Sequence, residues 1–333
     1  MVKRPGIITR VLGTALLGAA AAAAAWAAPP SEAHGSFDRT LKVSEPVSLD
    51  VRTGSGNIRV RRGDSSSVVI HAELRSSRGD WGGDSDTERR IREIEKNPPI
   101  EQDENSIHIG QTHDNDLYHN ISISYEIQVP GQTRLEAQTG SGNFSATGVQ
   151  MEINGRTGSG TIRVEDAAGR VDLSAGSGEV ELHNARGGGQ LRAGSGNVIA
   201  DGVSGSLRAS SGSGNVRIAE SGAGDVEANS GSGNIRASGI KGGLRCSTGS
   251  GDIDASGEQH GDWNLRTGSG NVTVELPKGA GFELDAHSGS GSIQTDREII
   301  VSGTLSHHDI RGRAGAGGPL LMVRTSSGSI YLR

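Results

Sequence analysis

The sequence predicts an all-β fold, a parallel β-helix or β-solenoid with about 18–19 residues per coil. Three observations predict it: a Gly-Ser-Gly tripeptide that recurs at a nearly constant spacing, apolar residues that alternate with polar ones around each tripeptide, and 53 glycines beside only 3% aromatic residues. Such a short period is below the size of a helical repeat and fits one coil of stacked parallel strands. We expect the right-handed form.

The tripeptide occurs ten times. The first copy begins at Gly54, and the other nine begin at residues 140, 158, 176, 194, 212, 231, 249, 268 and 289. Most neighbouring copies start 18 or 19 residues apart, and we take this spacing as the length of one coil. A coil of this length has room for two main strands. A degenerate copy of the motif, TSSGSIYLR, closes the chain.

The alternation along each coil predicts which side chains face the core. In one repeat, Ile162 and Val164 alternate with polar residues before a turn, and Val171 and Leu173 do so after it. Period-two alternation is typical of strands with one buried face. Cys246 falls in an inward column of this kind, so we expect a small core residue there and not a reactive thiol.

Glycine and asparagine dominate the predicted turns. Two glycines per turn would allow positive φ angles without steric cost, and the Asn that often follows them, as at Asn57, tolerates the left-handed region. Stacked Asn side chains would also form a ladder along the axis. The tripeptide lacks the G-x-G-x-x-G spacing of a dinucleotide loop, so we predict no cofactor.

Calcium is the strongest metal alternative. The most common interval between tripeptides is 18 residues, and a calcium-binding β-repeat has a period of about nine residues, half that interval. That repeat needs a column of carboxylates. Only Glu179 and Asp252 are acidic among the ten residues that follow the tripeptide. We therefore predict no metal in the repeat, and an isolated site near Asp80, Asp84 and Asp86 is an open alternative.

The first residues have the pattern of an export signal. Lys3, Arg4 and Arg10 form a basic region before an alanine-rich apolar stretch, and the sequence AWA that ends at residue 27 has the form of a cleavage site. We predict a signal peptide over residues 1–27. An uncleaved membrane anchor is the alternative, because the apolar stretch is just long enough to span a bilayer.

The rest of the chain divides into a predicted linker over 28–35, an N-terminal β region over 36–130 and solenoid repeats over 131–333. An excursion at about 76–105 leaves the repeat pattern and predicts either a short helix over 85–96 or a charged loop. It would cap the exposed edge at the start of the stack. The period breaks again at about 298–318.

Three stretches carry a resemblance to a known family: LDVRTGSGNIRV, YEIQVP and the ladder of TGSGNI-like units. The chain resembles a bacterial family of candidate adhesins, which are secreted or envelope β-strand-repeat proteins with a domain of unknown function. The resemblance covers roughly residues 36–333. It implies the fold and supplies no catalytic residues.

The sequence argues against catalysis and against nucleic-acid binding. The formal net charge is −6, which is unlike that of a general nucleic-acid-binding protein. No G-x-S-x-G, H-E-x-x-H or EF-hand motif is present. The densest candidate cluster is His307-His308-Asp309, but adjacent histidines on a strand point to opposite faces. We predict no catalytic and no metal-binding residues.

Outward arginines are the one candidate for a ligand contact. The second strand of successive coils places Arg192, Arg208, Arg245 and Arg266 in one predicted column, and Arg217 and Arg236 belong to the first strand. Stacked arginines repel unless partners relieve the repulsion. One interpretation is pairing within the chain, through Glu227 and Asp285 in the same column. The other is contact with an anionic glycan or another envelope polymer, through planar guanidinium donors.

We therefore predict a non-catalytic exported β-solenoid, an adhesin or a structural or binding protein of the cell envelope. It would reside in the periplasm, on the cell surface or outside the cell. Its expected partner is an envelope glycan or protein, with no nucleic acid, and it would contact a membrane only through an uncleaved N-terminal segment. The alternatives are a polysaccharide-degrading β-helix enzyme and an envelope signalling or stress-response module that binds a partner protein.

Overall fold

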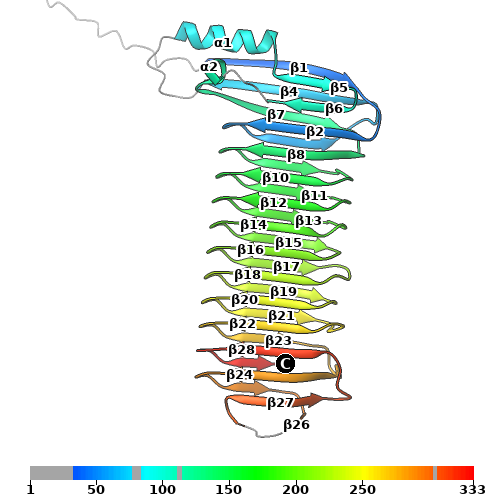
Figure 1. Cartoon of the computed structure of the whole chain (residues 1–333), viewed down its shortest axis with the longest axis vertical. Helices are drawn as coiled ribbons and strands as arrows, with labels where there is room; N and C mark the ends of the chain where they lie inside the picture. Colours follow the sequence, from blue (N-terminus) through cyan, green and yellow to red (C-terminus); the bar gives the residue numbers. More distant parts are fainter. Residues whose placement is uncertain (1–32, 77–83, 111–114, 303–305) are drawn as a thin grey trace, which may run out of the picture. The chain divides into compact units, whose positions relative to one another are not determined.

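The computed structural model describes residues 33–76, 84–110, 115–302 and 306–333. The predicted signal peptide and most of the predicted linker lie outside these residues. Two long sheets enclose one core (Figure 1), which confirms the predicted β-solenoid. In the described part of the chain, sheet A has 14 strands and sheet B has 15.

Each regular coil contributes one strand to each sheet, and neighbouring coils pair in parallel. Sheet A contains β9 (Phe144–Thr147), β11 (Ile162–Glu165), β13 (Val180–His183), β15 (Val198–Val203), β17 (Val216–Glu220), β19 (Ile235–Ile240), β21 (Ile253–Gly257) and β23 (Val272–Glu275). Sheet B contains β8 (Thr133–Thr139), β10 (Ile153–Thr157), β12 (Val171–Ala175), β14 (Gly189–Ala193), β16 (Leu207–Ser211), β18 (Val226–Ser230), β20 (Leu244–Thr248) and β22 (Trp263–Thr267).

The core consists of columns of aliphatic side chains, as the alternation predicts. Ile162 stands in register between Phe144 and Val180, and all three are buried. Cys246 is also buried, which confirms its predicted place, and burial raises the pKa of its thiol to about 12. Burial of these apolar columns is the main stabilising contribution to the stack.

The tripeptide glycines are required because successive coils approach one another closely. None of them lies in the left-handed region, so the prediction of positive φ angles at these turns is wrong. A Cβ atom on Gly233 would lie 2.1 Å from the carbonyl oxygen of Gly214 in the preceding coil. Gly54, at the first turn of the stack, has nothing within 4 Å of its Cβ position.

A ladder of buried hydroxyl groups runs beside these turns. The residue before each tripeptide is Thr or Ser in most coils. Thr248, for example, donates its hydroxyl to the carbonyl of Gly233 in the preceding coil over 2.9 Å and accepts the N–H of Gly251 over 3.2 Å. Ala175 and Ala193 occupy this position in two coils and interrupt the ladder.

The Asn column forms a second ladder, from side chain to backbone. Asn215 accepts the backbone N–H of Asn234 in the next coil at its Oδ1 over 2.9 Å, and Asn234 does the same for Asp252. The predicted ladder therefore exists, although its bonds do not join one amide side chain to the next. It is interrupted at Thr161 and Glu179.

The N-terminal region adds a cap to the stack. Its elements are β1 (His34–Lys42), β2 (Val47–Thr53), β3 (Ile58–Arg62), β4 (Ser67–Ser76), α1 (Asp84–Lys96), β5 (Ile100–Asp103), β6 (Ser106–Ile109), α2 (Asn115–Tyr118) and β7 (Ile121–Val129). Strands β2, β3, β6 and β7 join the sheets in parallel. Strands β1, β4 and β5 pair antiparallel to their neighbours, as hairpins do, instead of forming further coils.

Helix α1 covers the outermost strand of sheet A, β1 (Figure 1). The helical alternative for this excursion is therefore correct. Ile91 and Ile94 on one helix face are buried, and Glu95 accepts the backbone N–H of Ser36 in β1 over 2.8 Å. The helix thus blocks an edge that would otherwise pair with another chain.

The chain ends inside the stack. The last strands are β24 (Phe282–Ser288), β25 (Ile293–Thr295), β26 (Ile299–Val301), β27 (Asp309–Ala314), β28 (Leu320–Thr325) and β29 (Ile330–Leu332). Sheet B continues from β22 in the order β28–β24–β27–β26, and sheet A continues from β23 in the order β29–β25. The terminal repeat-like segment therefore inserts between two earlier coils.

Candidate binding groove on sheet B

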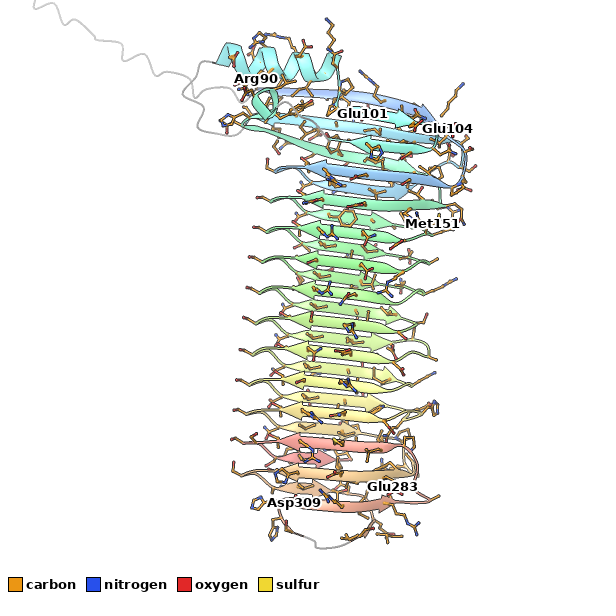
Figure 2. The ribbon with its side chains drawn as sticks, viewed as in Figure 1. Arg90, Glu101, Glu104, Met151, Glu283 and Asp309 are labelled. Atoms are coloured by element: carbon orange, nitrogen blue, oxygen red, sulfur yellow. The ribbon has the colours of Figure 1, made fainter. Side chains whose placement is uncertain are left out.

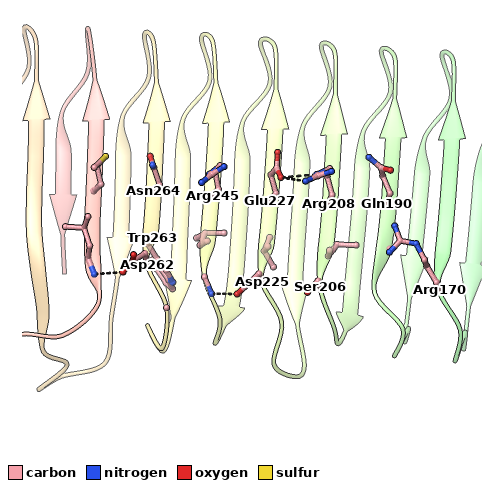
Figure 3. A pocket seen from close by; sticks show the side chains of 18 residues that line it. Arg170, Gln190, Ser206, Arg208, Asp225, Glu227, Arg245, Asp262, Trp263 and Asn264 are labelled. Atoms are coloured by element: carbon pink, nitrogen blue, oxygen red, sulfur yellow. Dashed lines mark hydrogen bonds and ion pairs between the residues drawn. The ribbon is translucent and has the colours of Figure 1, made fainter.

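A groove of about 730 Å³ crosses the outer face of sheet B (Figure 3). Most of its lining residues come from β14, β16, β18, β20, β22 and β28 and from the turns before them. These strands are consecutive neighbours in the sheet. The groove therefore runs across the strands, in the direction in which the coils stack.

Two outward columns of side chains stand on this face of sheet B, each at one register position, and only the first of them lines the groove. The groove column contains Gln190, Arg208, Glu227, Arg245, Asn264 and Met322. The flanking column contains Arg192, Ser210, Asn229, Ser247, Arg266 and Arg324. We call the two columns together the arginine face.

The residues just before strands β16, β18, β20 and β22 give the groove its depth, because their side chains are short or are hydrogen-bonded back to the backbone. Ser206, Asp225, Gly243 and Asp262 line this part. Asp225 accepts the backbone N–H of Gly243 at its Oδ1 over 2.8 Å, and Asp262 accepts that of Leu320 over the same distance. Both carboxylates are thus held against the backbone by these bonds.

The six predicted arginines lie on opposite faces of the solenoid. Arg192, Arg208, Arg245 and Arg266 project from sheet B, and Arg217 and Arg236 project from sheet A. Because both sheets face the same core, their outer surfaces point away from each other. The six arginines do not form one stripe.

The predicted single column on sheet B is also wrong. Arg208 and Arg245 belong to the groove column, whereas Arg192 and Arg266 belong to the flanking column. The physical reason is that Gly189 and Trp263 occupy inward positions. If Leu191 and Leu265 are taken as the first inward residues of their strands instead, the predicted register of β14 and β22 is shifted by two residues.

The arginines differ in how they are paired. Arg208 contacts Glu227 at 2.8 Å, Arg236 contacts Asp254 at 3.1 Å and Arg217 lies 3.8 Å from Asp201. Among the described residues, Arg192 and Arg245 make no ion pair and no side-chain hydrogen bond. Arg266 has only a contact of 3.7 Å with the sulfur of Met322. Pairing within the chain therefore explains the sheet A arginines and Arg208, but not these three.

The arginine face carries an excess of positive charge on a protein whose net charge is negative. Its two columns hold five arginines and one carboxylate, that of Glu227, whereas the groove is lined in addition by Arg170, Asp225 and Asp262. The hydrogen bond from Arg208 lowers the pKa of the Glu227 carboxyl, so this group is charged at neutral pH. Asp285 in the neighbouring strand pairs with Arg324 at 3.0 Å. Arg192, Arg245 and Arg266 keep free guanidinium donors.

The other candidate groups are engaged elsewhere. Asp309 lies near the C-terminal end of the stack (Figure 2) and contacts His287 at 2.6 Å, and the His308 ring contacts the carbonyl of Gly291 at 2.7 Å. Asp86 pairs with Arg89, whose hydrogen bond lowers the pKa of that carboxyl. Asp80 lies outside the described residues.

Two kinds of site are absent from the part of the chain that the structure describes. No group of three or more His, Cys, Asp or Glu side chains is placed to hold a metal ion. No helix in the same ranges is both long and apolar enough to cross a membrane.

The sequence interpretation missed the neutral polar residues of the groove. Gln190 and Asn264 lie in the groove column beside the arginines, and Asn264 Oδ1 is buried without a hydrogen bond in the described structure. Their signal in the sequence is their register position. That position can be read only once Gly189 and Trp263 are recognised as core residues.

Comparison with solved structures gives distant similarities. A candidate cell adhesion protein from Clostridium sporogenes is 12% identical, with a TM-score of 0.26, and the match covers 90% of this chain and 99% of that one. A candidate adhesin from Bacteroides fragilis is 12% identical, with a TM-score of 0.37 and coverage of 90% and 97%. A candidate lipid binding protein from Parabacteroides distasonis is 16% identical, with a TM-score of 0.41 and coverage of 90% and 96%.

A comparison with curated proteins gives no match. The model of the family Toastrack DUF4097 matches residues 47–333, which include every coil of the stack and most of the cap. This match confirms the resemblance carried by the repeated turns and strands. The chain belongs to the Toastrack DUF4097 family.

Proposed function

We propose that this protein is an exported, non-catalytic binding protein of the cell envelope that holds an acidic polysaccharide on the arginine face. The observation that carries the proposal is a set of three arginines without ion pairs on the arginine face. Arg245 lines the groove on sheet B, and Arg192 and Arg266 stand in the flanking column. Guanidinium groups bind carboxylates through two parallel hydrogen bonds. An acidic glycan would supply those carboxylates.

The groove supports binding better than bond cleavage. Cleaving a glycosidic bond by acid–base chemistry needs a group free to exchange protons with the substrate. Glu227 is paired with Arg208, and Asp225 and Asp262 accept backbone N–H groups. These carboxylates are committed to contacts within the fold, which is why we favour a binding protein over a polysaccharide-degrading enzyme.

The test measures binding of the purified protein to polygalacturonate, with neutral dextran as the uncharged comparison. We expect the variant R192Q/R245Q/R266Q to bind polygalacturonate at least about tenfold more weakly, a loss of about 1.4 kcal/mol or more. The matched control R163Q/R217Q/R236Q removes the same charge from sheet A, where each arginine has a carboxylate partner within 4 Å. This control should bind within twofold of the unmodified protein.

Three results would overturn the proposal. An equal loss in both variants would mean that binding depends on net charge and not on the arginine face. Failure of the unmodified protein to bind any acidic polysaccharide would remove the ligand class. Shortening of the polymer during incubation would show that the protein is an enzyme.

A further inference from the structure

We infer that the ligand is a linear polysaccharide that lies along the stacking direction, across the strands, with about one sugar residue per coil. This inference rests on the proposed function and adds the orientation, repeat and length of the ligand. It follows from the way the groove is built, since each coil contributes one residue to the groove column and one to the flanking column.

The spacing of the coils matches an extended sugar chain. Neighbouring strands of a sheet lie about 4.8 Å apart, and one residue of an extended (1→4)-linked pyranose chain advances by a similar length. The register pairs Arg208 with Glu227 and Glu227 with Arg245, so successive side chains stand at the same height on successive strands (Figure 3). A chain that crosses the strands would therefore meet an equivalent position at every sugar residue.

The side chains of the arginine face suit a ligand with both hydroxyl and carboxylate groups. Between the arginines stand Gln190, Ser210, Asn229, Ser247 and Asn264, which are uncharged hydrogen-bonding residues. Amides and hydroxyls bind sugar hydroxyls, and guanidinium groups bind carboxylates. This mixture of neutral and cationic donors suits an acidic polysaccharide.

A single-stranded nucleic acid fits the same groove less well. Binding of single strands relies on aromatic side chains that stack on the bases. The aromatic side chain nearest the groove, Trp263, is fully buried and donates its ring N–H to the carbonyl of Gly242 over 3.1 Å. Both columns of the arginine face lack aromatic residues.

The length of the groove sets the length of the bound segment. Six neighbouring strands, from β14 to β28, contribute to it, and they span about 24 Å at the usual strand spacing. The groove should therefore hold a segment of about six sugar residues. A shorter oligomer would leave some of the donors unoccupied.

The experiment measures the affinity of oligogalacturonates of two to ten residues for three proteins. For the unmodified protein, affinity should rise several-fold with each added residue and level off at about six. Duplicating residues 194–211, which form one coil with β15 and β16, inserts a coil into the groove. The length at which affinity levels off should then increase by one residue.

The matched control duplicates residues 140–157, a coil of the same length with β9 and β10. It lengthens the stack outside the groove and should leave the preferred oligomer length unchanged. Circular dichroism verifies that both longer proteins fold.

A length dependence that does not move with the inserted coil, or that moves equally in both variants, would overturn the inference while the proposed function stands. Tighter binding of single-stranded oligodeoxynucleotides than of oligogalacturonates would overturn the sugar class. An absence of binding to every acidic oligomer and polymer would instead remove the proposed function itself.

Discussion

Gly233 shows why the Gly-Ser-Gly tripeptide recurs along the chain. At Gly233 the hydrogen atom faces the carbonyl of Gly214, and no larger group fits. The corresponding glycine of each stacked coil lies equally close to a carbonyl of the preceding coil. Glycine is therefore needed once in every coil at this position. The tripeptide is therefore a contact between coils, and its glycines leave no surface for a phosphate or a metal ion.

The first prediction follows from this contact. Gly233→Ala should destabilise the protein by about 3 kcal/mol or more, because its Cβ atom would overlap a fixed backbone carbonyl. Gly54→Ala is the matched control, because its Cβ position is open, and its effect should stay within about 1 kcal/mol. Thermal unfolding followed by circular dichroism compares the two. Equal midpoints would contradict this explanation of the repeated glycines.

The hydroxyl ladder permits a gain of stability. Ala175→Thr and Ala193→Thr would each add a hydroxyl that donates to the carbonyl of Gly160 or Gly178, as Thr248 does to Gly233. Each substitution should stabilise the protein by about 1 kcal/mol. The new hydroxyl at residue 175 would accept a hydrogen bond from the backbone N–H of Gly178, and the one at residue 193 would accept one from Gly196. Hydrogen exchange at these two N–H groups should therefore slow. Unchanged or faster exchange there would show that the ladder is incidental to stability.

At the scale of the element, the coils differ in how completely the two hydrogen-bond ladders join them to their neighbours. The coils around residues 175–197 lack the ladder hydroxyl at Ala175 and Ala193, and they also lack the Asn acceptor at Glu179. Two separate hydrogen-bond ladders are thus interrupted in adjacent coils. These coils flank β14, where the groove begins.

The last residue of β17, Glu220, is a half-buried acid. Both carboxylate oxygens of Glu220 are shielded from solvent and make no hydrogen bond of normal geometry to another described residue. Burial raises its pKa to about 7, the charge of Asp225 adds to the rise, and the backbone amide of Lys241 opposes it. The folded state therefore retains a proton that the unfolded chain releases above pH 4.5.

The sign of the pH dependence follows from this retained proton. Stability should fall as the pH rises from about 4.5 to about 7 and stay at the lower level above that range. The slope should be well below the limit of about 1.4 kcal/mol per pH unit, because Glu220 is partly exposed. Glu220→Gln should raise the unfolding midpoint at pH 8 and remove this slope. A midpoint that falls at pH 8 would contradict the assignment.

The elements themselves were largely predictable, and the exceptions have physical causes. The alternation around Ile162 and Val171 identifies two strands per coil, because a narrow core admits only that pattern. The antiparallel pairing of β1 with β4 was not predictable, because antiparallel and parallel strands show the same alternation. Helix α1 remained one of two alternatives, since only its packing on β1 decides between a helix and a charged loop.

At the scale of the whole molecule, the unexpected feature is the place of the chain end. Strands β28 and β29 pair on both sides with earlier coils, and Leu321 and Val323 are fully buried there. Arg297 also donates to the carbonyl of Arg333 over 3.0 Å. Sequence order could not predict this insertion, because every copy of the repeat offers a similar edge.

The inserted coil should hold the last strands in place. Val323→Asp buries an unpaired charge and should cost about 3 kcal/mol or more. Because coils contact only their neighbours, β24 to β27 should loosen while the coils before β20 stay folded. Limited proteolysis should then release C-terminal fragments. Ile300→Asp, at a side chain that is 59% exposed, should have no such effect. Loss of the entire stack in V323D would contradict local coupling.

The candidate site was predictable in part. Residue type identified the arginines as the outward feature that pairing does not fully explain. Their division between two faces, and between two columns on sheet B, required the register that Gly189 and Trp263 conceal. The groove itself depends on Ser206, Asp225 and Gly243, whose short or tethered side chains give no signal before the strands are aligned.

The most direct test of the account is the structure of the protein in complex with a galacturonate hexamer. We expect the hexamer to lie in the sheet B groove, to cross β14 to β28 along the stacking direction and to place carboxylates against Arg245 and its neighbours. A hexamer bound on sheet A, at an end of the stack or parallel to the strands would contradict it.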